Sequence, residues 1–309
     1  MNEQNYDVVI VGGGTAGLSA ALVLGRARRR VAVVDAGQPR NAPAAHMHGY
    51  LSREGMPPAE LLRVGRAEIT GYGVDIIADR VAGIDRELNV TLETGRVVSG
   101  RRLLVATGVN DEIPQIEGFS DRWGRDLLHC PYCHGWEVRD EPLGVLGTID
   151  GSVEHALLVR QWSEDVVFFV QAYPLVPTER RELEARGVRV ENGEVTRLIV
   201  DNDRLRGVEL SDGRCIARSA VFVRPRITPH ADGLLDSLGL ETSAAGFPTV
   251  DATGRTSNPK VWAAGNVADP RAQVITAAGA GSAAAIAINA DLVRDDVAVA
   301  LRLRAGQSA

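Results

Sequence analysis

Two cysteines separated by two residues, with a histidine on either side, form the part of this sequence best suited to chemistry: His129, Cys130, Cys133 and His134. Two thiols at this spacing can close a small disulfide ring, and an imidazole with an ordinary pKa of about 6.5 can take up and return protons near neutral pH. The segment predicts a two-electron relay in which a substrate thiolate attacks Cys130 and Cys133 leaves as the thiolate. His134 is the first candidate for the acid and base, and His129 is the second.

A zinc site is the alternative use of such a cysteine pair. A structural zinc tetrahedron usually takes two pairs, and Cys215, the remaining cysteine of the chain, has no partner at matching spacing. Three cysteines are too few for a disulfide framework in a chain of this size. We therefore expect a redox pair and no metal.

Two aromatic residues, Tyr132 and Trp136, flank the cysteines. Their side chains form either an apolar wall for a small substrate or a part of the core. The sequence favours neither alternative over the other.

A glycine-rich turn near the N-terminus predicts a dinucleotide-binding unit. The expected order is strand, turn, helix and strand, over residues 6–11, 12–17, 18–24 and 31–34. Gly12 permits the tight turn, Gly14 lets the backbone approach a pyrophosphate, and Gly17 allows the helix to pack closely on the strand. Asp35 follows the second strand, where an acid accepts hydrogen bonds from a ribose. A glycine-rich turn without a ligand is the alternative, and the ordered context argues against it.

A second unit of the same kind begins at residue 143, but its turn lacks the features that hold phosphate. The expected strand, turn, helix and strand cover residues 143–146, 147–152, 153–161 and 166–170. Ile149 stands where glycine would let a pyrophosphate approach, and Asp150 adds negative charge nearby. The second strand ends with neither an acid for a ribose nor arginines for a 2′-phosphate. NADPH binding is therefore not expected.

The other histidines are harder to assign. The segment 40–71 is irregular and then helical, and its His46 and His48 lie either in a substrate or flavin pocket or at the surface. His155, inside the second expected helix, and His230 are expected to be structural.

The composition is that of an ordinary globular protein of 309 residues, with 45% hydrophobic residues and a net charge of −6. Without a basic patch, nucleic acid is not an expected partner. The N-terminus has no secretory pattern, so we expect a cytoplasmic location. The apolar stretch 277–290 is too short and too interrupted to span a bilayer, so no membrane is expected.

The C-terminal part of the chain is expected to rejoin the first unit. Residues 261–267 indicate a buried strand that enters a turn, and residues 277–289 indicate a helix rich in small side chains. Hinges are expected near 112–114 and 242–246. The fold class is thus α/β, with two doubly wound Rossmann-like domains, the second inserted into the first. The expected domains are 1–112 with 244–309, which bind FAD, and 113–243, which carries the cysteine pair.

Over essentially its whole length the sequence resembles the low-molecular-weight thioredoxin reductases. The motifs that carry this resemblance are the N-terminal glycine turn with Asp35, Ala106-Thr107-Gly108, the cysteine pair, and Ala264-Gly265-Asn266-Val267. The resemblance implies bound FAD and a homodimer. The cofactor-binding residues that it implies are Gly12, Gly14, Gly17, Asp35, Thr107, Gly108, Gly265, Asn266, Gln273 and Val274.

Within that family the sequence is most similar to FAD-dependent dithiol oxidases that close disulfides in natural products such as gliotoxin and holomycin. His134 and Asn266 stand where the reductases have aspartates, and Ala272 and Val274 replace an arginine and an alanine. The resemblance implies oxidation of a small-molecule dithiol by the cysteine pair and FAD, with O2 as acceptor and H2O2 as product. The alternatives are a thioredoxin reductase driven by NADPH or ferredoxin, and a flavoprotein without catalytic activity.

Overall fold

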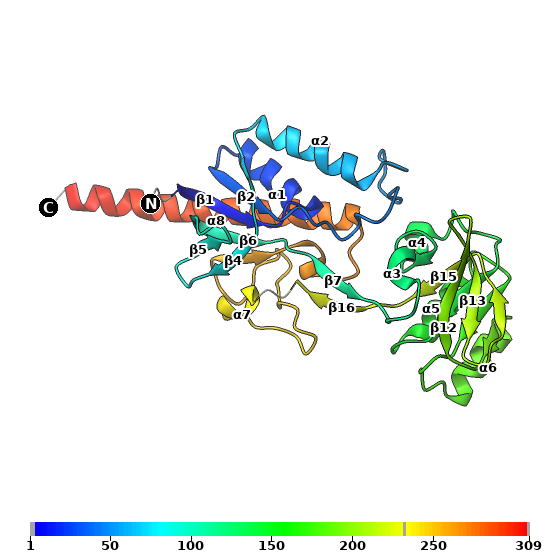
Figure 1. Ribbon diagram of the computed structural model, residues 1–309. Helices are drawn as coiled ribbons and strands as arrows, with labels where there is room; N and C mark the ends of the chain where they lie inside the picture. The colour runs from blue at the N-terminus through cyan, green and yellow to red at the C-terminus, as the bar shows by residue number, and fades with distance from the viewer. Residues whose placement is uncertain (1–3, 231–232, 308–309) are drawn as a thin grey trace. The chain divides into compact units, whose positions relative to one another are not determined.

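The computed structural model describes residues 4–230 and 233–307, and the chain divides into two compact units (Figure 1). Unit 1 comprises residues 1–42, 58–110 and 228–309. Unit 2 comprises residues 43–57 and 111–227.

Unit 1 contains a mostly parallel sheet. Its strands are β1 (Gln4–Val11), β2 (Val31–Asp35), β3 (Asp75–Ala78), β4 (Val81–Ile84), β5 (Asn89–Leu92), β6 (Val97–Val105) and β17 (Val261–Ala263). Their order is β3-β2-β1-β6-β5-β4, and β17 pairs in parallel with the end of β6. The helical segments are α1 (Thr15–Arg26), α2 (Pro58–Thr70), α7 (Leu234–Ser237), η1 (Gly265–Val267) and α8 (Val274–Gln307).

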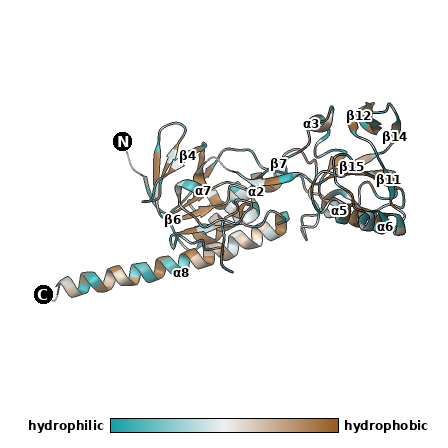
Figure 2. Cartoon of the chain, turned by 90° about the horizontal axis from the view of Figure 1, so that it is seen from below, coloured by the Kyte–Doolittle hydropathy of each residue, from teal (hydrophilic) through white to brown (hydrophobic). Residues whose placement is uncertain are grey.

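Two apolar layers cover this sheet, because alternate side chains of each strand point to opposite faces. Val8 and Ile10 pack with α1 and α8, whereas Val9 and Val11 pack with α7 and with β4 and β5. The strands are accordingly the most hydrophobic part of the unit in Figure 2. The arrangement places the carboxyl ends of β1, β6 and β17 side by side.

Unit 2 is built on a second parallel sheet of order β11-β10-β9-β15-β8. Its strands are β8 (Leu127–Leu128), β9 (Leu143–Leu146), β10 (Val166–Phe169), β11 (Arg189–Glu191) and β15 (Ala220–Val223). An antiparallel sheet is formed by β12 (Val195–Asp201), β13 (Arg204–Leu210) and β14 (Cys215–Ala217). The helices are α3 (Phe119–Arg122), α4 (Pro131–His134), α5 (Ser152–Val159) and α6 (Pro177–Ala185). β7 (Val109–Glu112) pairs with β16 (Arg226–Pro229), where the chain passes between the units.

The two doubly wound domains agree with the fold class expected from the sequence, but one boundary differs. The first passage into unit 2 lies at 110/111, close to the expected position, whereas the return lies at 227/228 and not at 243/244. The physical reason is α7, whose Leu234 and Leu235 are buried in the core of unit 1. Residues 242–246 lie within unit 1 and form an exposed turn and not a hinge; in this turn the amide of Gly246 donates to the carbonyl of Ser243 at 2.9 Å. A further difference is that residues 43–57 belong to unit 2.

The C-terminal helix α8 is much longer than the expected helix over 277–289. Among the described helices it is the one that is long and apolar enough to cross a membrane by length and composition. The expectation that this stretch is too short is therefore wrong about length. Core helices also pass such a test, and the inner part of α8 is buried against unit 1 through Ala284, Ala285, Ile288 and Leu292.

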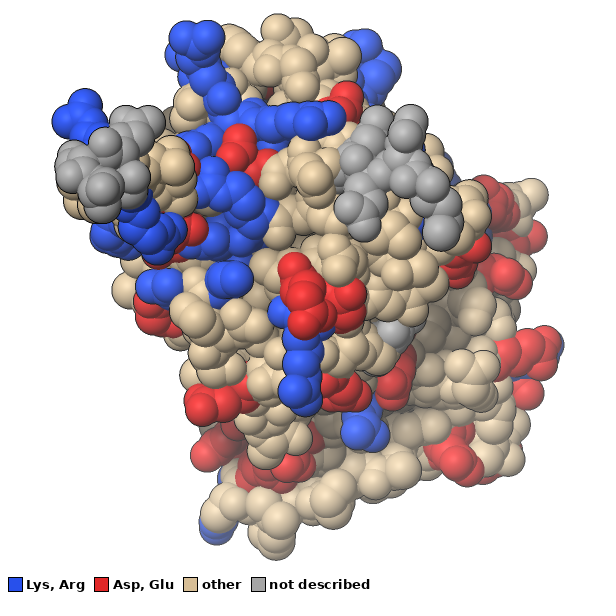
Figure 3. All heavy atoms as spheres, turned by 90° about the vertical axis from the view of Figure 1, so that its left-hand side faces the viewer, with Lys and Arg blue, Asp and Glu red and all other residues tan. Residues whose placement is uncertain are grey.

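Ion pairs connect the next turns of α8 to the rest of unit 1. The buried guanidinium of Arg102 lies 2.6 Å from Asp291 and 2.7 Å from Asp295, and Arg29 lies 2.8 Å from Asp296. Figure 3 shows the corresponding face of the molecule, where basic side chains gather with acidic side chains between them. The helix is thus fixed by charge as well as by packing.

Candidate active site

The first glycine turn lies at the carboxyl ends of three neighbouring strands. Gly12 donates to the carbonyl of Val34 at 2.8 Å, Ala106 to that of Val11 at 2.8 Å, and Ala264 to that of Val105 at 3.0 Å. Three motifs that are far apart in sequence therefore meet at one edge of the sheet. This edge is where open α/β sheets bind their ligands.

The three glycines of the turn differ in what surrounds them. A Cβ on Gly17 would lie 1.9 Å from the carbonyl oxygen of Gly12, and one on Gly12 would lie 2.3 Å from that of Ala106, at a φ of +108°. A Cβ on Gly14 would meet nothing within 4 Å. Gly12 and Gly17 are thus required by the fold, whereas Gly14 leaves open space at the N-terminus of α1.

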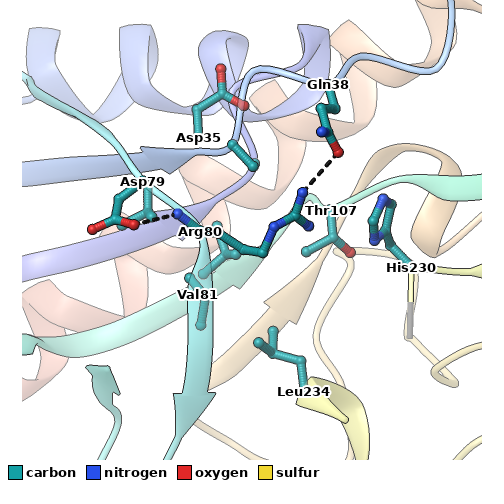
Figure 4. A pocket seen from close by; sticks show the side chains of 12 residues that line it. Asp35, Gln38, Asp79, Arg80, Val81, Thr107, His230 and Leu234 are labelled. Atoms are coloured by element: carbon teal, nitrogen blue, oxygen red, sulfur yellow. Dashed lines mark hydrogen bonds between the residues drawn. The ribbon is translucent and has the colours of Figure 1, made fainter. Parts of the chain in front are cut away.

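A pocket opens beside this turn (Figure 4). Gly12, Asp35 and Thr107 line it, as the motifs predict. The Thr107 Oγ1 atom is buried and has no hydrogen-bond partner among the described residues, which suits an additional ligand. Asp35 is held by Arg66, whose Nη2 donates to it at 2.8 Å, and by the amide of Gly37. The residues present therefore fit the dinucleotide part of FAD.

Several residues of this pocket were not found from the sequence. Asp79, Arg80, Val81, His230 and Leu234 also line it, with Gln38, which accepts a 2.8 Å hydrogen bond from Arg80 (Figure 4). The position of residues 79–81 just after the parallel strand β3 is the signal that could have identified them. His230, expected to be structural, lies in the pocket instead.

The second flavin motif is also at this edge of the sheet. Gly265 has a φ of +77° and approaches Ala16, so that a Cβ would lie 2.9 Å from the alanine side chain. The side-chain Nδ2 of Asn266 donates to the carbonyl of Ala272 at 2.9 Å and holds the turn before Gln273 and Val274. Asn266 therefore shapes the start of α8. Gly108, with a φ of +77°, turns the chain away after β6.

In unit 2 the cysteine pair forms a disulfide at the start of the short helix α4. Cys130 and Cys133 are bonded, and their Cα atoms are 5.2 Å apart. The amide of Cys133 donates to the Cys130 sulfur at 3.2 Å, and Pro131 occupies the first helical position. Gly135 follows because a Cβ there would lie 2.8 Å from the Trp162 ring. The two cysteines of the expected redox pair are therefore joined in this structure. Among the described residues, no group of three or more metal-binding side chains occurs.

The two histidines beside the disulfide have different surroundings. His129 follows β8, and its ring centroid lies 6.2 Å from that of His155. Burial is the main cause that lowers the pKa of His155 to about 3, so His155 is neutral at physiological pH. Burial also lowers the pKa of His134, with opposing effects from Glu137 and His48. His134 is thus neutral at pH 7 and able to accept a proton.

The aromatic neighbours of the disulfide are exposed. Tyr132 is 63% exposed and Trp136 is 65% exposed, so neither is part of the core. The Tyr132 ring meets Trp162 edge-on, and the Arg139 guanidinium lies 4.0 Å from the Trp136 ring centroid. They provide an apolar surface next to the disulfide.

The side chain of Ser152 fills the turn of the second nucleotide-like unit. The buried Ser152 hydroxyl accepts hydrogen bonds from the amides of Thr148 at 3.2 Å and Ile149 at 3.3 Å, and it donates to the carbonyl of Ile149 at 2.6 Å. Loop amides of this kind hold phosphate oxygens in dinucleotide-binding units. Ser152 was not singled out from the sequence.

A two-domain oxidoreductase with a dinucleotide pocket and a redox disulfide is the class that this fold and these sites define. Residues 6–282 match the model of the family described as pyridine nucleotide-disulphide oxidoreductase. The chain belongs to this family, whose members are flavoproteins that use FAD.

Individual relatives cover nearly the whole chain. It is 33% identical to the thioredoxin reductase sirT of Leptosphaeria maculans, over 96% of this chain and 98% of that protein. The solved structure of HlmI is 56% identical and has a TM-score of 0.96, over 99% of this chain and 98% of that one. The solved structure of an oxidoreductase from Agrobacterium tumefaciens is 35% identical and has a TM-score of 0.88, over 94% of this chain and 99% of that one. These matches confirm the resemblance to thioredoxin-reductase-like enzymes.

Substitution of the first glycine turn should separate folding from cofactor binding. We expect Gly14→Ala to fold normally but to retain about tenfold less FAD, equivalent to about 1.4 kcal/mol, because the new methyl group occupies the open space. Gly17→Ala should instead lower the free energy of unfolding by about 3 kcal/mol or more, because its methyl group meets the Gly12 carbonyl. Flavin absorbance and denaturant unfolding measure the two effects. Equal flavin content in Gly14→Ala and the parent protein would contradict this assignment.

Gly135→Ala should destabilise unit 2 by about 1–3 kcal/mol, because the methyl group would press on Trp162 and on the Pro131 carbonyl. Gly83→Ala is the matched control, since a Cβ there meets nothing within 4 Å. Denaturant unfolding monitored by tryptophan fluorescence is the measurement. An unchanged midpoint for Gly135→Ala would contradict this prediction, because it would mean that the turn accommodates the methyl group without loss of stability.

Proposed function

We propose that this protein oxidises a small-molecule dithiol to a disulfide through Cys130, Cys133 and FAD, with O2 as the final electron acceptor. The observation that carries the proposal is that the Ser152 hydroxyl accepts hydrogen bonds from the amides of Thr148 and Ile149 in the second turn. A nicotinamide coenzyme would have to displace this hydroxyl and pass the Ile149 side chain. The Cys130–Cys133 disulfide and the pocket lined by Gly12, Asp35 and Thr107 support a path in which electrons enter from thiols.

The thiol chemistry follows from the disulfide turn. A substrate thiolate attacks the Cys130 sulfur, the Cys130–Cys133 bond breaks, and Cys133 leaves with the electron pair. The second substrate thiol then attacks the mixed disulfide and releases Cys130. The substrate has lost two electrons and two protons, and the cysteine pair has gained the two electrons. His134 accepts a substrate proton, since its lowered pKa keeps it neutral at pH 7.

Bound FAD supplies the two-electron chemistry that returns the cysteines to the disulfide and delivers the electrons to oxygen. The overall reaction balances as dithiol and O2 to disulfide and H2O2. The exposed rings of Tyr132 and Trp136 support a small, partly apolar substrate, because they offer a binding surface beside the sulfur atoms.

An NADPH-dependent thioredoxin reductase is the second candidate. Arg224 favours it, because its Nη1 lies 3.5 Å from the Gly151 carbonyl, at the start of α5, where a cation would assist phosphate binding. Relatives in Leptosphaeria maculans and Aspergillus oryzae that are named thioredoxin reductases also favour it. A ferredoxin-dependent reductase is a further alternative, since it would not need a nicotinamide site.

Anaerobic mixing distinguishes these functions. We expect NADPH and NADH to leave the flavin oxidised and dithiothreitol to bleach it, because electrons enter only through the disulfide. Cys133→Ser should abolish bleaching by thiols, whereas Cys215→Ser, a change at an exposed free thiol, should leave it intact. In air, dithiothreitol and the protein alone should produce H2O2. Rapid bleaching by NADPH would overturn the proposal.

We also propose that the protein is a cytoplasmic homodimer. The exposed free thiol of Cys215 suits a reducing compartment. On its exposed side, α8 carries one stripe of apolar side chains at helical spacing: Ile286, Val293, Val297 and Leu301. The same stripe on a second copy would cover it.

Charge placed in this stripe should separate the subunits. We expect Val293→Asp/Val297→Asp to halve the mass measured by size-exclusion chromatography with light scattering, because two carboxylates would be buried at the contact. Val299→Asp, on the other side of the helix, is the control and should leave the mass unchanged. A monomeric parent protein would refute the dimer.

A further inference from the structure

Arg80 lines the pocket of unit 1 close to the acid that follows β2, and no sequence motif assigns it a role. β3 runs parallel to β2, and Ala78, the last residue of β3, is paired with Asp35. The chain continues from there as Asp79 and Arg80, which line the same pocket as Asp35 (Figure 4). The register of two parallel strands therefore places Arg80 beside the expected ribose-binding acid.

The Arg80 guanidinium is held between two loops. Its Nη2 donates to Gln38 Oε1 at 2.8 Å, in the loop after β2, and its Nε lies 3.6 Å from Glu93 Oε1, in the turn between β5 and β6. The backbone is fixed as well: the amide of Arg80 donates to the Asp79 carboxylate at 2.7 Å, and its carbonyl accepts from the amide of Glu93 at 2.9 Å. The side chain stays 30% exposed, so the guanidinium is anchored and still open to a ligand.

Next to Arg80 the lining of the pocket is apolar. Val81 and Leu234 line this part and are 7% and 3% exposed, and Figure 4 shows them on the side of Arg80 that faces away from Asp35. The faces of an aromatic base are apolar, and a guanidinium is planar, weakly hydrated and able to stack on aromatic rings. This combination of side chains suits a planar base.

The order of the strands decides which half of FAD would reach this part of the pocket. In dinucleotide-binding units the pyrophosphate lies at the first glycine turn, and the acid after the second strand binds the adenosine ribose. The strand order here is β3-β2-β1, so a base attached to that ribose would lie beyond β2, at the end of β3. The adenosine half of FAD would therefore meet Arg80, and the flavin half would extend in the other direction.

We propose that Arg80, anchored by Gln38, is a specificity-determining residue that binds the adenine base and selects FAD over FMN. FMN carries the same flavin ring but lacks the adenosine half, so it would leave Arg80 without a contact. This role depends on FAD as the cofactor of the proposed oxidation, but it involves neither the thiols nor oxygen.

The test is a titration of the full-length protein, freed of flavin, with FAD, FMN and ADP. Fluorescence quenching gives the Kd of each flavin, and competition with FAD gives the Kd of ADP. We expect Arg80→Met to raise the Kd of FAD and of ADP by about tenfold, because the aliphatic stem remains and the planar cation is lost. The Kd of FMN should stay unchanged.

Two further variants examine how Arg80 acts. Arg80→Lys should weaken FAD binding as much as Arg80→Met does, because an ammonium group has no planar face to stack on a base. Gln38→Ala should raise the Kd of FAD by about threefold, because the guanidinium loses one of its anchors. Full affinity for FAD in Arg80→Lys would overturn the inference, because charge alone would then be sufficient.

Arg63→Met is the matched control. Arg63 is 67% exposed on α2 and is paired with Glu60, and it is not among the residues that line the pocket. All three Kd values should therefore equal those of the parent protein. Denaturant unfolding of each variant without flavin checks that the fold is intact. An unchanged Kd of FAD or of ADP in Arg80→Met would overturn the inference, as would an equal loss of FAD and FMN.

These measurements separate the role of Arg80 from the proposed function. If FAD binds tightly but dithiothreitol does not bleach it, dithiol oxidation fails, and the Kd values still decide the role of Arg80. A parent protein that binds FMN as tightly as FAD would overturn the selectivity and leave the oxidation standing. If FMN binding is too weak to measure, the change in the Kd of ADP decides.

Discussion

Close backbone contact between helices and strands is the constraint on which the flavin-binding unit depends. α1 can approach β1 only because Gly17 leaves room for the Gly12 carbonyl, and α8 can approach α1 only because Gly281 leaves room for the carbonyl of Ala16. These contacts bring the N-terminus of α1 and the ends of three strands to one place. The FAD pocket is therefore a consequence of packing, and its polar groups, such as Asp35, are added at positions that the packing fixes.

The glycine-rich turns of the two Rossmann-like units differ in what fills them. In the first turn, a Cβ on Gly14 would meet nothing within 4 Å, and Gly14 caps the N-terminus of α1 without a side-chain hydrogen bond. In the second turn, the amides of residues 148 and 149 are already satisfied by the Ser152 hydroxyl. A phosphate would have to replace an internal hydrogen bond that is buried and well formed, and the gain from its binding is reduced accordingly. The sheet of unit 2 survives as support for the redox segment.

Sequence patterns predicted β1, α1 and β2 in unit 1 and β9, α5 and β10 in unit 2, because strand and helix periodicity is local and glycine turns have few conformations. They also located the disulfide and three residues of the pocket in unit 1, Gly12, Asp35 and Thr107. They did not predict the antiparallel sheet of β12, β13 and β14. They failed where side chains meet only through the fold. His230 and Arg80 line the FAD pocket from loops without a motif, and Ser152 closes the second turn through a contact that spacing does not reveal. The expected helix over 277–289 is shorter than α8, because the outer turns of α8 mix polar and apolar residues and lack the run of small side chains that indicated the helix.

The chain crosses between its two units four times, at 42/43, 57/58, 110/111 and 227/228. A single proteolytic cut at any one crossing therefore leaves three covalent connections intact. Neither unit can be isolated by simple truncation, since each is assembled from separate stretches of polypeptide. During synthesis, the first unit also has to wait for the last stretch, including β17 and α8, before its sheet is complete and its central helix is covered.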